Sequence, residues 1–370
     1  MIYVLVFLVI IGITLNSISK KYVLYNLTYK REINKRIVEI GEEFEVVTVV
    51  ENRKMFPVTF LQIIEKFPSS LNYKFKAVIQ PTTDYVYHTT TMLIMPYQRV
   101  KRNYKVYCNK RGRFIFRDVT LIGGDLLGFN TTIDNVDYSQ DIVVLPKAAD
   151  LDSTIIPYGD YNGDFSVRRW IIDDPVLTVG IKEYTGTEPE RTIHWPSSLK
   201  SGRLMVKKFD YTSDNTAMIL LNIECSKPFW AGINKKDIEE CISIARAVVE
   251  KFEELGIPYG FATDAYYSGN NEGGSVQAAG FGVTHYYDIV ENLGRIDYDI
   301  CINFEELLLK QINNNVNYTT LVIITPSILE SYVEHINSLS QIAIKTIVIA
   351  LESTNMKYLG DDILSFIKRG

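Results

Sequence analysis

The spacing of apolar residues changes along this chain, and that change limits its possible folds more than any other feature. From about residue 22 to residue 145, apolar and polar residues alternate with a period of two, as in the segment that starts at Phe44. Such alternation is typical of strands with one buried face. After residue 217, short apolar runs alternate with segments whose apolar residues recur every three or four positions. That second pattern predicts buried strands followed by helices.

The change of spacing predicts two domains of different class. We expect an all-β, immunoglobulin-like sandwich over residues 22–148 and an α/β domain over residues 213–370. Residues 149–212 lie between them and form a connector whose first part is rich in Pro, Gly and Asp. A chain of 370 residues is long enough for two such domains, each with its own core.

The second domain is predicted to be a doubly wound, parallel sheet. Its strands should include Ala217–Ile223, Tyr259–Thr263 and Thr319–Thr325, with a capped helix over Asn234–Leu255 and a closing helix over Asp361–Lys368. Sheets of this class bind ligands at the carboxyl ends of their strands. The loops that follow the three strands are therefore where we expect a site.

The first 18 residues contain no charged side chain. A helix of that length spans about 27 Å, close to the thickness of the hydrocarbon layer, so we predict a transmembrane anchor over residues 1–19. A signal peptide would need a basic start, and a buried core helix is seldom apolar on all sides. Six Lys and Arg side chains follow between residues 20 and 36 and none precedes the run. The positive-inside rule then predicts a single-pass protein of the cell membrane with most of the chain in the cytoplasm.

Composition excludes several function classes. The net charge of -5 argues against a broad nucleic-acid-binding surface. The four cysteines are far apart and include no CxxC pair, which argues against a structural zinc site. No Walker-type phosphate loop is present either, so the chain is not expected to be an ATPase itself.

The segment from Gly180 to Phe209 concentrates side chains that form buried polar anchors and interface hot spots. Arg191 could form a bidentate pair with Glu183 or Glu188, with Trp195 and Tyr184 packed over it. The cluster could hold the two domains together, or it could form a docking surface for a partner, and both roles can coexist. The candidate residues are Glu183, Tyr184, Arg191, His194, Trp195, Ser198, Lys200 and Lys207.

This segment resembles the hallmark of the bacterial domain-of-unknown-function-58 family, approximately E-Y-x-x-G-D-x-x-R-x-I-x-W. Upstream, Arg111–Phe114 and Asp125–Phe129 resemble two further motifs of that family, so the resemblance covers nearly the whole chain. Thr187 and Glu188 stand where the family has Gly-Asp, so the tight turn there can differ. The residues that match the hallmark are Glu183, Tyr184, Arg191, Ile193 and Trp195.

The resemblance implies a fold and a function. The C-terminal part of the family is similar to the von Willebrand factor A domain. Its members resemble partners of MoxR-type AAA+ ATPases in the maturation of envelope proteins and complexes. On that basis we expect a membrane-anchored scaffold or adaptor that engages such an ATPase and is not itself an enzyme.

Von Willebrand factor A domains bind Mg²⁺ through a D-x-S-x-S sequence at the end of the first strand, and this chain departs from it. The corresponding strand here ends Asn222-Ile223-Glu224-Cys225-Ser226, which keeps only the last Ser in register. We therefore expect a degenerate site and no cofactor. A Mg²⁺-dependent ligand-binding or adhesion module on the outer face is the alternative. The remaining candidate ligands are Asn222, Ser226, Thr263 and Asp264.

A third hypothesis is a hydrolase. His194 lies near Glu183 in the sequence and could take part in acid–base chemistry, while Cys225 at a strand end could act as a thiol nucleophile. No nucleophile motif surrounds either residue. A polar structural role for His194 is the simpler interpretation.

Overall fold

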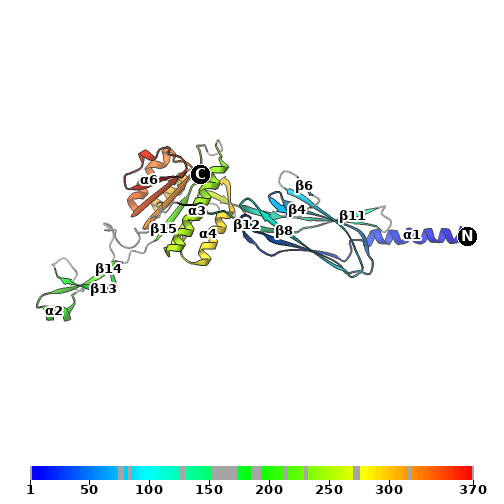
Figure 1. The fold of residues 1–370 in the computed structure, drawn as a ribbon, viewed down its shortest axis with the longest axis horizontal. Coiled ribbons are helices and arrows are strands. Elements are labelled where there is room, and N and C mark those ends of the chain that lie inside the picture. Colours follow the sequence, from blue (N-terminus) through cyan, green and yellow to red (C-terminus); the bar gives the residue numbers. More distant parts are fainter. Residues whose placement is uncertain are drawn as a thin grey trace. The chain divides into compact units, whose positions relative to one another are not determined.

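A computed structural model describes most of the chain, and its residues form two compact units (Figure 1). Strands hold 42% of the described residues and helices 28%. The described ranges are 2–73, 79–81, 85–125, 130–151, 173–184, 193–211, 216–228, 232–269, 276–314 and 318–368. Unit 1 comprises Met1–Ala149, Tyr266–Gly273 and Thr284–Asp299, and unit 2 comprises Asp150–Ala265, Gly274–Val283 and Ile300–Gly370.

Unit 1 consists mainly of three sheets. Their strand orders are β1-β3-β8-β5, β11-β10-β4-β7-β6 and β2-β12-β9, and all neighbours are antiparallel except β2 and β12. The strands are β1 (Leu27–Ile33), β2 (Ile37–Glu39), β3 (Phe44–Asn52), β4 (Val58–Pro68), β5 (Leu71–Tyr73), β6 (Ile79–Pro81), β7 (Tyr85–Ile94), β8 (Arg99–Cys108), β9 (Gly112–Phe116), β10 (Val119–Gly124), β11 (Thr131–Val136) and β12 (Gln140–Leu145).

The alternation in the sequence becomes burial in unit 1. Along β3, buried positions alternate with half-buried ones for most of its length, because successive side chains of a strand point to opposite faces. The buried faces of all three sheets meet in shared cores. One core joins Phe44 of β3, Phe67 of β4 and Phe116 of β9, and their side chains are almost completely shielded from solvent.

A helix from the C-terminal half of the sequence also belongs to unit 1. It is α4 (Val283–Arg295), and it leads into β19 (Ile296–Ile300), which pairs with β17 (Ala265–Tyr267). The helix approaches β12 at Gly294, where an added Cβ would lie 2.8 Å from Val143 Cγ1. Only glycine fits at that point without displacing the strand.

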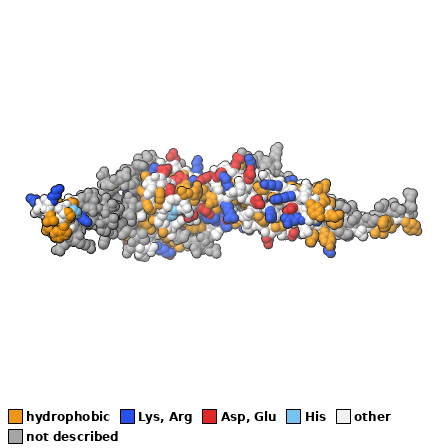
Figure 2. All heavy atoms as spheres, turned by 90° about the horizontal axis from the view of Figure 1, so that it is seen from below, with side chains coloured by type: hydrophobic (Ala, Val, Ile, Leu, Met, Phe, Trp, Pro, Cys, Tyr) orange, Lys and Arg blue, Asp and Glu red, His pale blue; other side chains and the backbone are white. Residues whose placement is uncertain are grey.

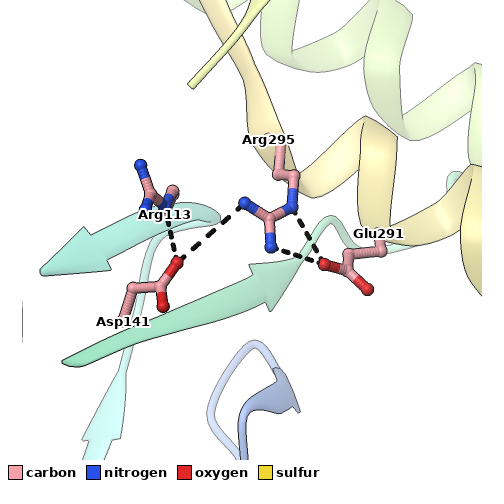
Figure 3. A network of polar contacts seen from close by, with 4 residues as sticks. All are labelled: Arg113, Asp141, Glu291 and Arg295. Atoms are coloured by element: carbon pink, nitrogen blue, oxygen red, sulfur yellow. Dashed lines mark hydrogen bonds and ion pairs between the residues drawn. The ribbon is translucent and has the colours of Figure 1, made fainter. Parts of the chain in front are cut away.

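Charged side chains hold the end of α4 against β9 and β12 (Figure 3). Arg113 Nε donates to Asp141 Oδ2 at 2.6 Å, and Arg295 Nη1 lies 4.0 Å from the same oxygen. Arg295 also donates to Glu291 one turn earlier, at 2.6 Å. The two guanidinium groups lower the pKa of Asp141 against the opposing effect of burial. Arg111 adds hydrogen bonds to the backbone carbonyls at the end of the helix.

Unit 2 contains a six-stranded sheet with strand order β18-β16-β15-β20-β21-β22, in which only β18 is antiparallel to its neighbour. A separate antiparallel pair is formed by β13 and β14. The strands are β13 (Asp173–Glu183), β14 (Met205–Tyr211), β15 (Ala217–Leu221), β16 (Tyr259–Thr263), β18 (Gln277–Gly280), β20 (Thr320–Thr325), β21 (Lys345–Ala350) and β22 (Ile363–Ile367). The helices are α2 (Trp195–Ser201), α3 (Lys235–Leu255), α5 (Phe304–Asn313), α6 (Glu330–Ile342) and the short η4 (Met356–Tyr358).

The predicted fold class, a transmembrane helix followed by a sandwich and a von Willebrand factor A-like α/β domain, is wrong as a whole. Strands predominate among the described residues. The C-terminal half does not form one α/β domain by itself, because α4 and most of β17 and β19 pack into unit 1. Helical spacing indicates that a segment has one apolar face, and it does not indicate which sheet that face will cover.

The transmembrane anchor predicted over residues 1–19 is also wrong. Residues 2–19 do lie in a helix, α1 (Ile2–Tyr22). However, no helix in the part of the chain that the structure describes is long and apolar enough to cross a membrane. The last two turns of α1 carry polar side chains, including Lys20 and Lys21, and Asn16 Nδ2 donates to Asp125 Oδ2 of unit 1 at 3.1 Å. The predicted single-pass location in the cell membrane, and the cytoplasmic orientation derived from it, depended on this anchor and have no support without it.

The closing helix predicted over Asp361–Lys368 is a strand. Its apolar residues are spaced compatibly with either state, and the structure pairs β22 with β21 in parallel register, from Ile363 opposite Thr346 to Ile367 opposite Ala350. Pairing with a neighbouring strand therefore decided the conformation of this segment.

Candidate functional site

The carboxyl ends of β15, β16 and β20 bring a set of polar side chains together in unit 2. Asn222 follows β15, Asp264 follows β16 and Thr325 ends β20, and all three are buried. The Asn222 amide donates to Thr325 Oγ1 at 2.8 Å and accepts from the backbone N–H of Glu224 at 2.7 Å. Parallel strands place their carboxyl ends along one edge of a sheet, which explains how residues about 100 positions apart come into contact.

Asp264 is completely buried in this cluster. Its carboxyl group accepts from the backbone N–H of Ile223, at 3.0 Å to Oδ1, and the Thr263 hydroxyl lies 3.4 Å from the same atom. Burial raises the pKa of Asp264 to about 8, and the nearby Glu224 carboxylate acts in the same direction. The hydrogen bond from Ile223 opposes the rise without cancelling it. Burial therefore favours the neutral form of the Asp264 carboxyl.

Two further residues of the cluster were not predicted from the sequence. Glu224 is 2% exposed, and the Tyr332 hydroxyl from α6 donates a hydrogen bond to its Oε2. Burial raises the pKa of Tyr332, and the bond to Glu224 adds to the rise. The sequence could have indicated Glu224 as a site residue, because an acidic side chain there follows an apolar strand. Nothing in the sequence around Tyr332 indicates that it belongs to the cluster.

Hydrogen bonds within the protein engage the oxygen atoms of the cluster. The Asn222 amide donates to Thr325 Oγ1, the Thr325 hydroxyl donates to the carbonyl of Ser327, and the Asp264 carboxyl accepts from the backbone N–H of Ile223. Ser226, the fourth predicted ligand, donates to the carbonyl of Pro228 at 3.3 Å instead of joining the cluster. Among the described residues, no group of three or more His, Cys, Asp or Glu side chains could hold a metal ion.

The geometry around the predicted nucleophile does not activate it. Burial raises the pKa of the Cys225 thiol, although a reactive cysteine needs a lowered value. Its Sγ lies 3.5 Å from the carbonyl oxygen of Ile223. His194 accepts from the backbone N–H of Ser197 at 3.3 Å and so caps the start of α2.

The hallmark residues surround α2, a short helix that lies in sequence between β13 and β14. The helix is fixed at both ends, by the His194 cap and by Gly202, whose φ of 68° is the left-handed conformation that glycine favours. Ser198 is the buried residue of the helix, and its hydroxyl accepts from the backbone N–H of Met205 in β14 at 2.8 Å. These contacts anchor the helix to the β-hairpin.

Most other side chains around α2 face outward. Leu199 is 84% exposed and Trp195 61%, and Leu204 just after the helix is 44% exposed. The cationic side chains of Lys200, Arg203 and Lys207 are exposed beside them, and blue and orange side chains lie next to each other there at the left of Figure 2. We call these six residues the α2 surface.

The structure places the remaining hallmark residues at the base of the same segment. Glu183 at the end of β13 forms an exposed ion pair with Arg203 at 3.2 Å, and the backbone N–H of Tyr184 donates to the carbonyl of Leu204 at 2.8 Å. Arg191 lies outside the described residues. Arg203, Leu199 and Leu204 were not among the predicted site residues, although the sequence shows apolar and basic residues alternating there.

Comparisons with known proteins give no family assignment. No protein-family model matches the chain, and no curated protein sequence matches it. Among solved structures, similar chains include a cohesin module from a Clostridium perfringens family 33 glycoside hydrolase, at 12% identity and a TM-score of 0.25, covering 32% of this chain and 96% of that one. A CARDB domain of a Pyrococcus furiosus protein matches at 12% identity and a TM-score of 0.22, covering 32% and 91%. TM-scores of this size do not establish a shared fold.

Proposed function

We propose that this chain is a protein-interaction scaffold without a catalytic step of its own, and that its α2 surface binds the partner. The observation that carries the proposal is the exposure of Trp195, Leu199 and Leu204 next to three cationic side chains. Exposed apolar clusters with a charged rim are typical of protein-binding sites.

The way α2 is held supports this role. The His194 cap, the Gly202 turn and the Ser198 hydrogen bonds fix the backbone that carries the exposed side chains. A surface that is already ordered loses little conformational entropy on binding, so more of the contact energy contributes to affinity. Trp and Arg are also the residue types that contribute most to interface hot spots.

The chemistry of the α2 surface specifies its partner. Lys200, Arg203 and Lys207 favour an acidic surface, and the apolar side chains need a pocket at its centre. The resemblance to the domain-of-unknown-function-58 family, which stays a prediction, implies that this partner is a MoxR-type AAA+ ATPase acting in the maturation of proteins or envelope complexes.

The experiment is a pull-down of a MoxR-type ATPase from the same organism by the full chain. Leu199→Glu places a negative charge at the most exposed apolar position of the α2 surface, and it should reduce retention at least tenfold. Ile133→Glu is the matched control, since Ile133 is also exposed, at 61%, but lies on β11 of unit 1. Equal retention by both variants, or no retention by the unmodified chain, would contradict the proposal.

A further inference from the structure

The strand β22 forms an edge of the six-stranded sheet of unit 2. It pairs with β21 on one side, and none of the described strands pairs with its other side. The backbone N–H of Lys368 donates to the carbonyl of Ala350 at 3.0 Å. Since the backbone groups of successive residues in a strand point to opposite sides, Ile363, Ser365 and Ile367 direct theirs away from β21. The Ile363 N–H bonds to the carbonyl of Gly360 at 3.0 Å, so Ser365 and Ile367 carry the outward N–H groups of the edge.

This edge carries few of the features that keep edge strands from associating. The strand has the sequence ILSFI, without proline or charge, and its pairing with β21 runs without a bulge. Leu364 is 40% exposed and Ile367 is 49% exposed. A regular apolar edge whose backbone groups point away from the sheet is a template for another strand.

We propose that β22 pairs in antiparallel orientation with β22 of a second copy of this chain, about a two-fold axis at Ser365. In that register, Ser365 lies opposite Ser365 of the second copy. Ile363 then lies opposite Ile367, and Leu364 lies opposite Phe366. Apart from the central serine pair, all cross-strand pairs within the strand are therefore apolar. The two six-stranded sheets join into one continuous sheet.

Charges at the ends of the strand select this partner and this orientation. Asp362 precedes the strand and Lys368 follows it. Antiparallel pairing about Ser365 places Asp362 opposite Lys368 at both ends of the interface. Parallel pairing in register would instead place Asp362 opposite Asp362 and Lys368 opposite Lys368 of the second copy, and like charges opposite each other are unfavourable. The segment is therefore complementary to itself in one orientation only.

The two-fold geometry also limits the size and strength of the assembly. Each copy uses its β22 edge once, so the contact closes at a dimer and does not propagate into a filament. Five residues per copy form an interface smaller than the roughly 1,200–2,000 Å² of stable complexes. We expect a reversible dimer whose population rises with protein concentration.

The first test is sedimentation equilibrium of the full chain over a range of concentrations. Ser365→Pro removes the outward N–H at the centre of the interface but none of the N–H groups that bond to β21, so the sheet should stay intact. This variant should be monomeric at concentrations where the unmodified chain and Ser365→Ala, the matched control, are dimeric. A monomeric unmodified chain, or a Ser365→Pro variant that dimerises as well as Ser365→Ala, would overturn the proposal.

Charge exchange tests the register. Asp362→Lys and Lys368→Asp should each weaken the dimer at least several-fold, because each places like charges opposite each other twice. The double variant that carries both changes should recover the affinity of the unmodified chain. Weakening that is simply additive in the double variant would show that these two residues do not face each other.

Disulfide trapping tests the position of the axis. Ser365→Cys brings two thiols together at the two-fold axis, about 5.5 Å apart between Cα atoms, within the range for a disulfide. Asp361→Cys is the matched control, because its two copies would lie about 27 Å apart in this register. Under mild oxidation only Ser365→Cys should give a covalent dimer on a non-reducing gel. Equal cross-linking of both variants, or of neither, would refute the arrangement.

Discussion

The carboxyl group of Asp264 accepts a hydrogen bond at 3.0 Å from the backbone N–H of Ile223, inside a fully buried cluster. The contact joins the end of β16 to the residue that follows Asn222 after β15. Burial nevertheless dominates, and the pKa of Asp264 rises to about 8. The stability of unit 2 should therefore depend on pH in a way that one residue controls.

The first prediction concerns that pH dependence. The unfolded chain loses the Asp264 proton near pH 4, whereas the folded chain keeps it until about pH 8. The unfolded state therefore binds fewer protons between these values, and the free energy of unfolding falls as pH rises from about 4 to about 8. Asp264→Asn retains an acceptor but cannot ionise, so it should remove this component, which is on the order of a few kcal/mol.

Urea denaturation between pH 5 and pH 9, followed by circular dichroism, measures this effect. Asp288→Asn is the control, because Asp288 is exposed on α4 and should leave the pH profile unchanged. If the free energy of unfolding of Asp264→Asn followed that of the unmodified chain at every pH, the raised pKa of Asp264 would be contradicted.

The second prediction concerns the hydroxyl of Tyr332. Tyr332→Phe removes the donor to the buried Glu224 carboxyl and keeps the packing of the ring against Phe304, whose centroid lies 5.1 Å away. A buried acidic group that loses a hydrogen bond costs about 1–3 kcal/mol of unfolding free energy. Tyr358→Phe, at an exposed ring, should cost far less, and comparable losses in the two variants would argue against the bond.

The third prediction concerns the close approach of α4 to β12. Gly294→Ala should gain about 1 kcal/mol from helix propensity, but its Cβ would lie 2.8 Å from Val143 Cγ1 and 3.1 Å from the carbonyl oxygen of Val144. The clash should dominate, lower the melting temperature and increase hydrogen exchange in α4. Gly360→Ala is the control, since its nearest heavy atom would be 3.7 Å away. A stabilised Gly294→Ala variant would show that α4 can move away at little cost.

The fourth prediction concerns divalent cations. The oxygen atoms of Asn222, Thr325 and Asp264 are engaged in hydrogen bonds, so millimolar Mg²⁺ or Mn²⁺ should leave the melting temperature unchanged. A cation that binds only the folded state, at a concentration a hundred times its Kd, would add about 2.7 kcal/mol to the free energy of unfolding. A rise of several degrees that Asp264→Asn abolishes would favour the Mg²⁺-dependent alternative.

The sequence predicted secondary structure correctly where an element depends on residues close to it in the chain, as at helix caps and in short apolar strands. The helix predicted over Asn234–Leu255 is confirmed as α3, because Asn234 accepts from the backbone N–H of Lys236 and Gly256 takes the left-handed conformation that ends a helix. The strand predicted over Thr319–Thr325 is confirmed as β20, since a short run of buried β-branched residues has few other stable conformations.

The candidate site was predictable only in part. Asn222, Thr263 and Asp264 were expected at strand ends and do meet there, because parallel strands present their carboxyl ends together. Glu224 and Tyr332 were not predicted as a pair, because they are 108 residues apart and their contact depends on the position of α6. The exposure of Trp195 was also not predictable, since a tryptophan in a sequence motif can be buried or can face a partner.

The sequence by itself determined where strands and helices could form, which faces were apolar, and how α3 begins and ends, because these properties depend on neighbours in the chain. Tertiary structure decided that α4 packs against β12, that burial raises the pKa of Asp264, and that the segment after Asp362 is a strand instead of a helix. Each of these outcomes depends on burial or on pairing with residues far away in sequence, and the local pattern carries no information about either.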